Sequence, residues 1–337
     1  MSEMRPLLVD AATRAMAGAG EDYSDALWRA IEAAGLPGAM LAEQKGGSGA
    51  DWGDAMAILR VAGKLALPAP LAESMLAQSL LSECGLSVPA GPLTVAPVER
   101  DTVTLARTRN GWRLEGRARF VPWARVAGWI ATLALHEDGR PFVALVPRSD
   151  IGIEPAANLA DEPRDTITFA TDVPADAAAP AAMGLQGRGA MARAAMMAGA
   201  LEAVLELTVR YAGERQQFGR AIAKFQAIQQ QIAELAGHVA AAGVAADAAA
   251  AAPEDGFMLA VAKARVSEAC GPVAAIAHQV HGAMGFAREH RLNLYTRRLW
   301  SWRDEFGDEA YWWGVLGRAA AQAGSAGLWP LVTDRPQ

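Results

Sequence analysis

Hydrophobic positions at helical spacing mark the first part of the chain, residues 1–90. Leu8, Ala12 and Met16 recur every four residues, so they would share one face of a helix. Glycine and proline interrupt this pattern at several points, for example at Pro37, and separate one helix from the next. This part of the chain predicts an N-terminal helical domain.

Residues 91–178 change to short runs in which apolar and polar side chains alternate, as they do from Trp112 to Leu114. A period of two puts the apolar side chains on one face of a strand. Asn110 and Gly111 separate two such runs, and this dipeptide is a strong signal for a hairpin turn. We therefore expect a middle β-domain that is barrel-like and built from hairpins.

Long helical patterns return in residues 179–337. One helix is expected to end near Gly213, a second to run from Lys224 to Pro253, and a fourth to begin near Asp308, after a third over residues 255–283. Long antiparallel helices with short connections form a four-helix bundle. The predicted fold class is α+β, with the bundle as the C-terminal domain.

Composition narrows the classes of function. The chain has 337 residues, 52% of them hydrophobic and 20% charged, which is typical of a globular protein with a large core. Its two cysteines, Cys84 and Cys270, form neither a disulfide framework nor a metal-ligand cluster, so we expect no metal and a reducing cytoplasm. A formal charge of −6 argues against nucleic acid as the main partner. The apolar runs and the first residues predict neither a membrane span nor a secretory leader.

An arginine-rich, glycine-containing turn between two helices carries the main candidate for chemistry. The turn consists of Arg215, Gln216, Gln217, Phe218 and Gly219, and Phe225 and Gln226 follow it at the start of an amphipathic helix. Guanidinium and amide donors beside exposed backbone N–H groups suit a pyrophosphate. Taken alone, the same residues are also typical of a polar corner between two helices.

The order of helices, β-domain and bundle, together with the Arg215 turn, resembles the acyl-CoA dehydrogenase family. Residues 225–235 resemble the helix that follows the arginine turn in that family. Residues 279–286 resemble its Gln-x-x-Gly-Gly-x-Gly-Tyr/Phe segment, with Ala283 in place of the second glycine. The resemblance is strong over residues 185–315 and rests on architecture elsewhere.

The resemblance implies that FAD lies between the subunits of a dimer. One chain's β-domain and bundle would hold the flavin ring, while the neighbour's bundle would hold the adenine dinucleotide. Arg215 would pair with the pyrophosphate, since a planar cation suits a bidentate anion. The other contacts implied are Gln216, Gln217, Phe218, Phe225 and Gln226 on the turn side, and Gln279, Gly282 and Ala283 at the other end of the dinucleotide. The implied partners are an acyl-CoA substrate, an electron-transfer flavoprotein or similar acceptor, and further subunits in a homo- or hetero-oligomer (a dimer or tetramer).

The chemistry of this family needs a carboxylate base in a dry pocket, with a pKa raised by desolvation. The base removes the α-proton of an acyl thioester while the β-hydride passes to the flavin. Counting from the motifs puts Phe306 at one of the family's two base positions and Gly189 at the other. Neither is a carboxylate, so Glu305, one residue from the first position, is the catalytic candidate. In the alternative interpretation this stretch is only a turn, and Asp308 caps the last helix.

The segments that contact the flavin ring in the family are also altered. Residues 93–99 keep Thr94 and Pro97 but lack the family's Gly-Ser-Asp, and a loop whose hydroxyl reaches the ring has Pro122 and Trp123 instead. Trp123 could stack on a ring or pack inside the domain. For the phosphates of an acyl-CoA we expect Arg188 or Arg193, although either could equally be a solvated charge at a helix end.

Three hypotheses follow. In the first, the chain is an active FAD-dependent acyl-CoA dehydrogenase that uses Glu305. In the second, it is the non-catalytic subunit of a heteromeric acyl-CoA dehydrogenase and completes the FAD site of a partner chain. In the third, it is a scaffold or nucleic-acid-binding protein derived from the family, which the acidic charge disfavours.

Overall fold

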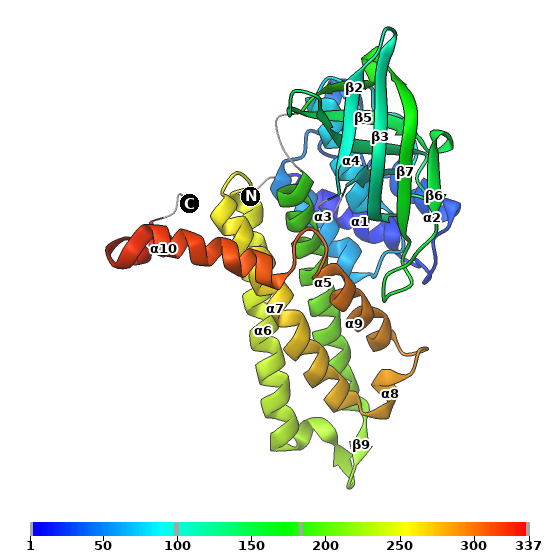
Figure 1. The fold of residues 1–337 in the computed structure, drawn as a ribbon. Coiled ribbons are helices and arrows are strands. Elements are labelled where there is room, and N and C mark those ends of the chain that lie inside the picture. The colour runs from blue at the N-terminus through cyan, green and yellow to red at the C-terminus, as the bar shows by residue number, and fades with distance from the viewer. Residues whose placement is uncertain (1–2, 98–100, 182–184, 335–337) are drawn as a thin grey trace.

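The protein is described by a computed structural model that covers residues 3–97, 101–181 and 185–334. The sheet and the N-terminal helices lie together around one end of the long bundle helices (Figure 1). A short two-stranded turn lies at the opposite end of the bundle (Figure 1). The bundle therefore has two ends with different surroundings.

The N-terminal part consists of short helices, as the sequence predicts. Ser24 accepts a hydrogen bond from the backbone N–H of Leu27, and Asp51 accepts one from that of Asp54, so each caps the helix that follows it. The last of these helices is buried over nearly its whole length, between the sheet and the bundle. The bounds are α1 (Arg5–Met16), α2 (Asp25–Ala33), η1 (Glu43–Lys45), α3 (Trp52–Lys64) and α4 (Leu71–Glu83).

The described part of the middle region folds into one eight-stranded sheet with the order β6-β7-β3-β2-β4-β5-β8, in which β1 also pairs with β4. The predicted hairpin at Asn110 and Gly111 joins β2 to β3, which pair antiparallel. The boundary expected after residue 178 falls inside β8, which pairs with β5. The strands are β1 (Leu93–Ala96), β2 (Val103–Arg107), β3 (Gly111–Pro122), β4 (Trp129–His136), β5 (Pro141–Pro147), β6 (Ile151–Glu154), β7 (Arg164–Pro174) and β8 (Ala178–Pro180).

Long helices form the C-terminal part, and their buried residues share one core with the N-terminal helices. Two glycines allow α3 to pack directly on the bundle. A Cβ at Gly63 would lie 1.9 Å from the carbonyl oxygen of Met196, and one at Gly199 would lie 1.9 Å from that of Arg60. The elements are α5 (Leu185–Glu214), β9 (Gln216–Gln217), β10 (Arg220–Ala221), η4 (Ile222–Lys224), α6 (Gln226–Ala251), α7 (Gly256–His281), α8 (Ala283–Phe286), α9 (Arg291–Trp302) and α10 (Glu309–Thr333).

The last helix, α10, starts on the bundle and then leaves it. Asp308 accepts a hydrogen bond from the backbone N–H of Tyr311 at 2.7 Å and so caps this helix, as one interpretation of the sequence expects. Its only buried residue among those described is Trp312. Beyond that residue the helix projects away from the body of the protein (Figure 1).

Helix α6 is the one described helix whose length and composition would allow it to cross a membrane. It packs in the bundle beside α5 and α7, with Leu235, Val239 and Ala242 in the core. Since the core helix of a soluble protein can pass the same test, this is weak evidence for a span.

Candidate functional site

The predicted pyrophosphate-binding turn is a small β-hairpin that links α5 to α6. Gln216 and Gln217 in β9 pair with Arg220 and Ala221 in β10. The backbone N–H of Ile222 donates to the carbonyl oxygen of Arg215 at 2.8 Å and closes the base of the hairpin. The sequence predicted a turn here, but it did not predict the strand pairing.

The tip of this hairpin is held in an unusual backbone conformation and faces solvent. Phe218 and Gly219 have φ angles of 51° and 77°, which a tight hairpin turn requires and which a phenylalanine rarely adopts. The Phe218 side chain is 92% exposed. Its ring meets that of Phe225 edge-on, with 6.1 Å between centroids. Arg215 and Gln217 are also exposed, and no carboxylate in the described ranges pairs with the Arg215 guanidinium.

The end of α7 lies beside this hairpin. The hydroxyl of Tyr211 donates to the carbonyl oxygen of His281 at 3.3 Å, and the two rings stack with 4.4 Å between centroids. Val280 packs in the same small apolar cluster as Phe225. The structure thus gathers at one end of the bundle the residues that the sequence analysis assigned to the dinucleotide: Arg215, Gln216, Gln217, Phe218, Phe225, Gln226, Gln279, Gly282 and Ala283.

The backbone after α7 is open to a ligand. Gly282 has a φ of 61°, and no atom lies within 4 Å of the position that a Cβ would take. Gln279 and Ala283 are exposed and line a cavity of about 480 Å³ with Gly282, Phe286 and Trp300. The sequence analysis missed Trp300. It lies in α9 far from the motifs, and only the fold brings it to α7.

The histidines at this end are part of the packing. His278 stacks on Phe286, with 4.4 Å between ring centroids, and its Nε2 lies 3.0 Å from the hydroxyl oxygen of Thr296. Burial lowers the pKa values of His278 and His281. Among the described residues no group of three potential ligands could hold a metal ion.

The two base positions of the family lie against each other at the opposite end of the bundle. A Cβ added to Gly189 would lie 2.2 Å from Cδ1 of the Phe306 ring. Phe306 is 2% exposed and has a φ of 55°. The aromatic ring therefore occupies the space beside α5 where a carboxylate from either position would have to lie.

Glu305 is held by two arginines. Arg164 Nε donates to Glu305 Oε1 and Arg193 Nε donates to Glu305 Oε2, each at 2.6 Å. Burial on its own raises the pKa of this carboxyl, but the two guanidinium groups outweigh burial and lower the pKa to about 2. The raised pKa expected of a base is therefore wrong for Glu305. Its catalytic role remains a prediction, and the geometry is that of a structural ion pair.

This pair belongs to a larger buried network. Arg193 also donates to Glu73 of α4, Arg164 to Glu162, and Arg298 of α9 to Glu162, so that three arginines balance three glutamates. The network joins α4, the β7 edge, α5 and α9 in the interior. Breaking one partner of such a network strands the other charges, whereas the intact network is neutral.

Arg188 and Arg193, the two residues expected to contact the phosphates of an acyl-CoA, both form ion pairs with glutamates. Arg193 is only 2% exposed, so the expectation that it serves as a solvated or phosphate-binding charge at a helix end is wrong. Arg188 pairs with Glu83 through both terminal nitrogens, at 2.8 and 2.9 Å. A phosphate contact from Arg188 stays a prediction.

The turn that carries Glu305 and Phe306 is held in place by a lysine of α7. Lys263 of α7 donates from Nζ to the carbonyl oxygens of Arg303 at 2.6 Å and Gly307 at 2.9 Å. Burial lowers the pKa of Lys263 to about 8. These bonds satisfy one carbonyl group just after α9 and one just before α10, so they fix the backbone on both sides of Phe306.

The two segments expected to contact a flavin ring form a hydrogen bond with each other. Thr94 is fully buried, and its hydroxyl donates to the carbonyl oxygen of Pro122. Trp123 is 5% exposed and packs beside Tyr23, with 6.4 Å between ring centroids. Of the two interpretations of Trp123, packing inside the protein is confirmed. Val98 and Glu99 of the same sequence segment lie outside the described residues.

FAD fits one end of the bundle better than the other. The hairpin end offers an exposed guanidinium, exposed amides and open backbone, the donor set that a dinucleotide needs. The base end offers neither a free carboxylate nor a free hydroxyl among the residues expected to serve a flavin ring.

Comparison with known proteins identifies the same family that the sequence motifs resemble. Residues 179–320 match the sequence family described as "Acyl-CoA dehydrogenase, C-terminal domain". Acyl-CoA dehydrogenase IpdE2 of Mycobacterium tuberculosis is 30% identical over 290 residues, which cover 86% of this chain and 84% of that protein.

Solved structures share the whole architecture. A variant of the steroid ACAD Tcur3481-Tcur3483 has a TM-score of 0.83 at 26% identity, with 96% of this chain and 98% of that chain covered. The ChsE4-ChsE5 complex from Mycobacterium tuberculosis has a TM-score of 0.85 at 24% identity, with the same coverage. These matches confirm the fold class that the sequence predicted.

Proposed function

Because the chain belongs to the acyl-CoA dehydrogenase family, we propose that it is the non-catalytic subunit of a heteromeric acyl-CoA dehydrogenase. It contributes the hairpin end of its bundle to an FAD molecule whose ring and base belong to a partner chain. The substrate of the complex is an acyl-CoA with a bulky acyl group.

One observation carries this proposal: the Phe306 ring fills the space over Gly189. Either family base position would have to present a carboxylate in this space. Glu305, the carboxylate next to Phe306 in the sequence, already accepts hydrogen bonds from two arginines at 2.6 Å. A proton acceptor with a pKa near 2 is a weak base at neutral pH, so it would remove an α-proton inefficiently.

The hairpin end supports a role toward a neighbouring chain. Arg215 would pair with the pyrophosphate of FAD, and Gln217 and Gln279 would add amide contacts. The side chain of Phe218 would cover an apolar edge of the cofactor. When bound, FAD supplies the acceptor for a hydride from the acyl chain. Since the hairpin projects from its own fold (Figure 1), a cofactor held there lies on the outer surface, where a second chain can enclose it.

The partner and substrate classes rest on the comparisons. Tcur3481-Tcur3483, which is 26% identical to this chain, is named for two proteins and as a steroid ACAD. We infer by analogy a hetero-oligomer that acts on a steroid-like or similarly bulky acyl-CoA. An electron-transfer flavoprotein or similar acceptor would take the electrons. The two free thiols fit a cytoplasmic location.

The experiment is to purify the chain alone and together with a catalytic family member encoded beside it. We expect a colourless lone chain, and a complex with flavin that reduces an acceptor when a bulky acyl-CoA is added. The Arg215→Ala variant should lower the flavin content of the complex. Arg210→Ala should not, since Arg210 is an exposed arginine of α5 five residues earlier.

Other outcomes separate the alternatives. A lone chain with one FAD per subunit that turns over an acyl-CoA, and whose Glu305→Gln variant stays folded and retains FAD but loses turnover, would establish the active enzyme instead. A chain that acquires no flavin with any partner and retains nucleic acid at moderate salt would establish the third hypothesis.

A further inference from the structure

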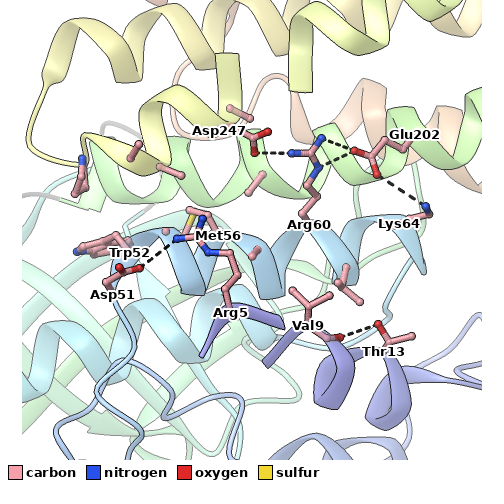
Figure 2. A pocket seen from close by; sticks show the side chains of 18 of the residues that line it. Arg5, Val9, Thr13, Asp51, Trp52, Met56, Arg60, Lys64, Glu202 and Asp247 are labelled. Carbon is pink, nitrogen blue, oxygen red and sulfur yellow. Dashed lines mark hydrogen bonds and ion pairs between the residues drawn. The ribbon is translucent and has the colours of Figure 1, made fainter. Parts of the chain in front are cut away.

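Two cavities in the described part of the chain differ in what they leave unpaired. The larger, of about 1050 Å³, lies along α3 between α1, α5 and α6, and its charges pair with one another, as Arg60 does with Glu202 and Asp247 (Figure 2). The smaller, of about 480 Å³, lies at the end of α7 and is lined by His278, whose buried Nδ1 has no partner among the described residues. A buried polar atom without a partner calls for an explanation.

Residues 282–286, which we call the α8 segment, pack directly on two histidines of α7. A Cβ added to Gly285 would lie 2.9 Å from the Cβ of His281 and 3.3 Å from Nδ1 of His278. The ring of Phe286 stacks on that of His278, with 4.4 Å between centroids. The two histidines are 5% and 3% exposed, so the α8 segment covers their rings and shields them from water.

The hydrogen bonds of both rings require the neutral form. Nδ1 of His281 lies 2.8 Å from the carbonyl oxygen of Ala277, which can only accept, so Nδ1 carries the proton and Nε2 is bare. The hydroxyl of Thr296 donates to the carbonyl oxygen of Asn293 at 3.4 Å, so Nε2–H of His278 donates to this hydroxyl at 3.0 Å and Nδ1 is bare. The two bare nitrogens are the buried atoms without a described partner. Protonation would add an N–H group at each of these positions, where no described group accepts it.

The groups around the rings do not favour a positive charge. Tyr211 of α5 stacks on His281, and His290 meets the same ring edge-on with 5.1 Å between centroids. Nδ1 of His290 accepts from the backbone N–H of Leu292 at 3.1 Å, so this third histidine is also bound through a bare nitrogen. Burial lowers the pKa values of His278 and His281 below the ordinary 6.5, and no carboxylate in the described ranges opposes this effect.

We propose that His278 and His281 are positioning residues that hold the α8 segment in place for the dinucleotide only while both rings are neutral. The proposal rests on the proposed function, because it concerns the regulation of the same FAD site. The segment begins with the open backbone at Gly282. Its support also reaches the hairpin, since the carbonyl oxygen of His281 accepts from Tyr211, and the carbonyl oxygen of Tyr211 accepts from the backbone N–H of Arg215.

The direction of the pH effect follows from burial. A closed segment keeps each ring neutral with a lowered pKa, whereas an open segment returns it to the ordinary value of 6.5. Closure is therefore fully favoured above pH 6.5 and weakens as the pH falls, by about tenfold at pH 5.5 for each ring that takes up a proton. The base end should not respond in this range, because the pKa of Glu305 is about 2.

Hydrogen exchange of the full-length lone chain at pH 7.5 and 5.5, with labelling times corrected for the intrinsic exchange rate, tests this without flavin. The readout is the protection of the hydrogen-bonded amides of Gly282 and Gly285. We expect it to fall in acid by up to about a hundredfold in the wild type, and by about tenfold in His278→Phe or His281→Phe, which keep an aromatic ring but cannot take up a proton. The matched control is His238→Phe, a half-buried histidine of α6, which should behave like the wild type. Protection that does not depend on pH in the wild type overturns the proposal, and so does a fall that neither substitution reduces.

Flavin release from the complex connects the α8 segment to the cofactor. After transfer from pH 7.5 to pH 5.5, we expect the wild-type complex to lose FAD faster than a complex whose chain carries both His278→Phe and His281→Phe. A segment that opens in acid while flavin release stays unchanged would show that FAD does not lie on it, which contradicts the proposed function. A segment that stays closed in acid contradicts the role of the histidines and leaves the proposed function standing.

Discussion

The two ends of the bundle differ in how their polar groups are used. At the hairpin end Arg215, Gln217 and Gln279 are exposed, and the backbone at Gly282 is open. At the base end Glu305 is bound by two arginines, and the hydroxyl of Thr94 is bound by a backbone carbonyl. The first end can gain partners, whereas the second has already satisfied its polar groups internally.

This contrast supports the proposal that the chain contributes the hairpin end of its bundle to a shared site. A buried polar group is stable only when it is paired, so an interior without a ligand must pair its own charges. The neutral network of three arginines and three glutamates does this. An exposed arginine such as Arg215 is solvated by water and pays no such cost when unpaired. It therefore remains available to bind a cofactor shared with another chain.

The largest effect is expected from Glu305→Gln. It leaves Arg164 and Arg193 without their shared carboxylate, so the free energy of unfolding should fall by about 3–5 kcal/mol. Denaturant unfolding at neutral pH measures this. Asp304→Asn, a neighbouring carboxylate that is mostly exposed, should change it by less than about 0.5 kcal/mol. Equal effects of the two variants would mean that the network contributes nothing.

The pH dependence of the same variant sharpens the test. The folded-state pKa of Glu305 lies below its ordinary value of 4.5, at about 2. Its contribution is therefore fully present above pH 4.5 and is lost as the pH falls toward 2. The difference in unfolding free energy between wild type and Glu305→Gln should shrink over this window. A difference that stays constant there would show that the carboxyl is not held as described.

A smaller effect is expected at the hairpin end from Arg215→Ala. Loss of a charge-assisted contact to a phosphate costs about 2–3 kcal/mol, or about thirty- to a hundredfold in affinity. Titration of FAD into the flavin-depleted complex measures it, with Arg210→Ala as control. The unfolding free energy of the lone chain should hardly change, because Arg215 is exposed. If Arg215→Ala left the flavin affinity unchanged, the hairpin would not be part of the FAD site.

Gly189→Ala tests the filled space directly. The new methyl group would collide with the Phe306 ring, and overpacking of this kind costs about 1–3 kcal/mol. The cost should almost vanish in a Phe306→Ala background, where a cavity takes the methyl group. Gly213→Ala is the matched control, since nothing lies within 4 Å of a Cβ there. The same cost in both backgrounds would mean that the ring does not lie on Gly189.

The last prediction is that the buried thiol of Cys270 does not react with an alkylating reagent. This thiol lies on α7 below the base end, and burial raises its pKa to about 12. We expect no alkylation of Cys270 in the native protein at pH 8, while unfolding exposes it. Labelling in the native state would reveal a path into the interior that the filled base end does not provide.

Local signals in the sequence predicted much of the fold. The Asn110-Gly111 turn joins β2 to β3, and Asp308 caps α10, because both features depend on a few neighbouring residues. The order and spacing of the motifs also predicted correctly that Arg215 and Gln279 lie at the same end of the bundle. Tyr211 and His281 form the contact that makes this possible.

Long-range pairing could not be predicted in the same way. Counting along the motifs put Gly189 and Phe306 at the base positions, but only the fold brings the ring onto the glycine. Glu305 pairs with residues 112 and 141 positions away. No local pattern distinguishes such a carboxylate from a desolvated base, so the sequence analysis expected a raised pKa where the structure gives a lowered one.

The visible absorption spectrum of the chain purified alone, recorded with an acyl-CoA and an electron acceptor, tests the central claim most directly. We predict no flavin band and no turnover, because the hairpin end holds only part of a cofactor that a partner must enclose. A bound flavin that the lone chain reduces with an acyl-CoA would contradict the account.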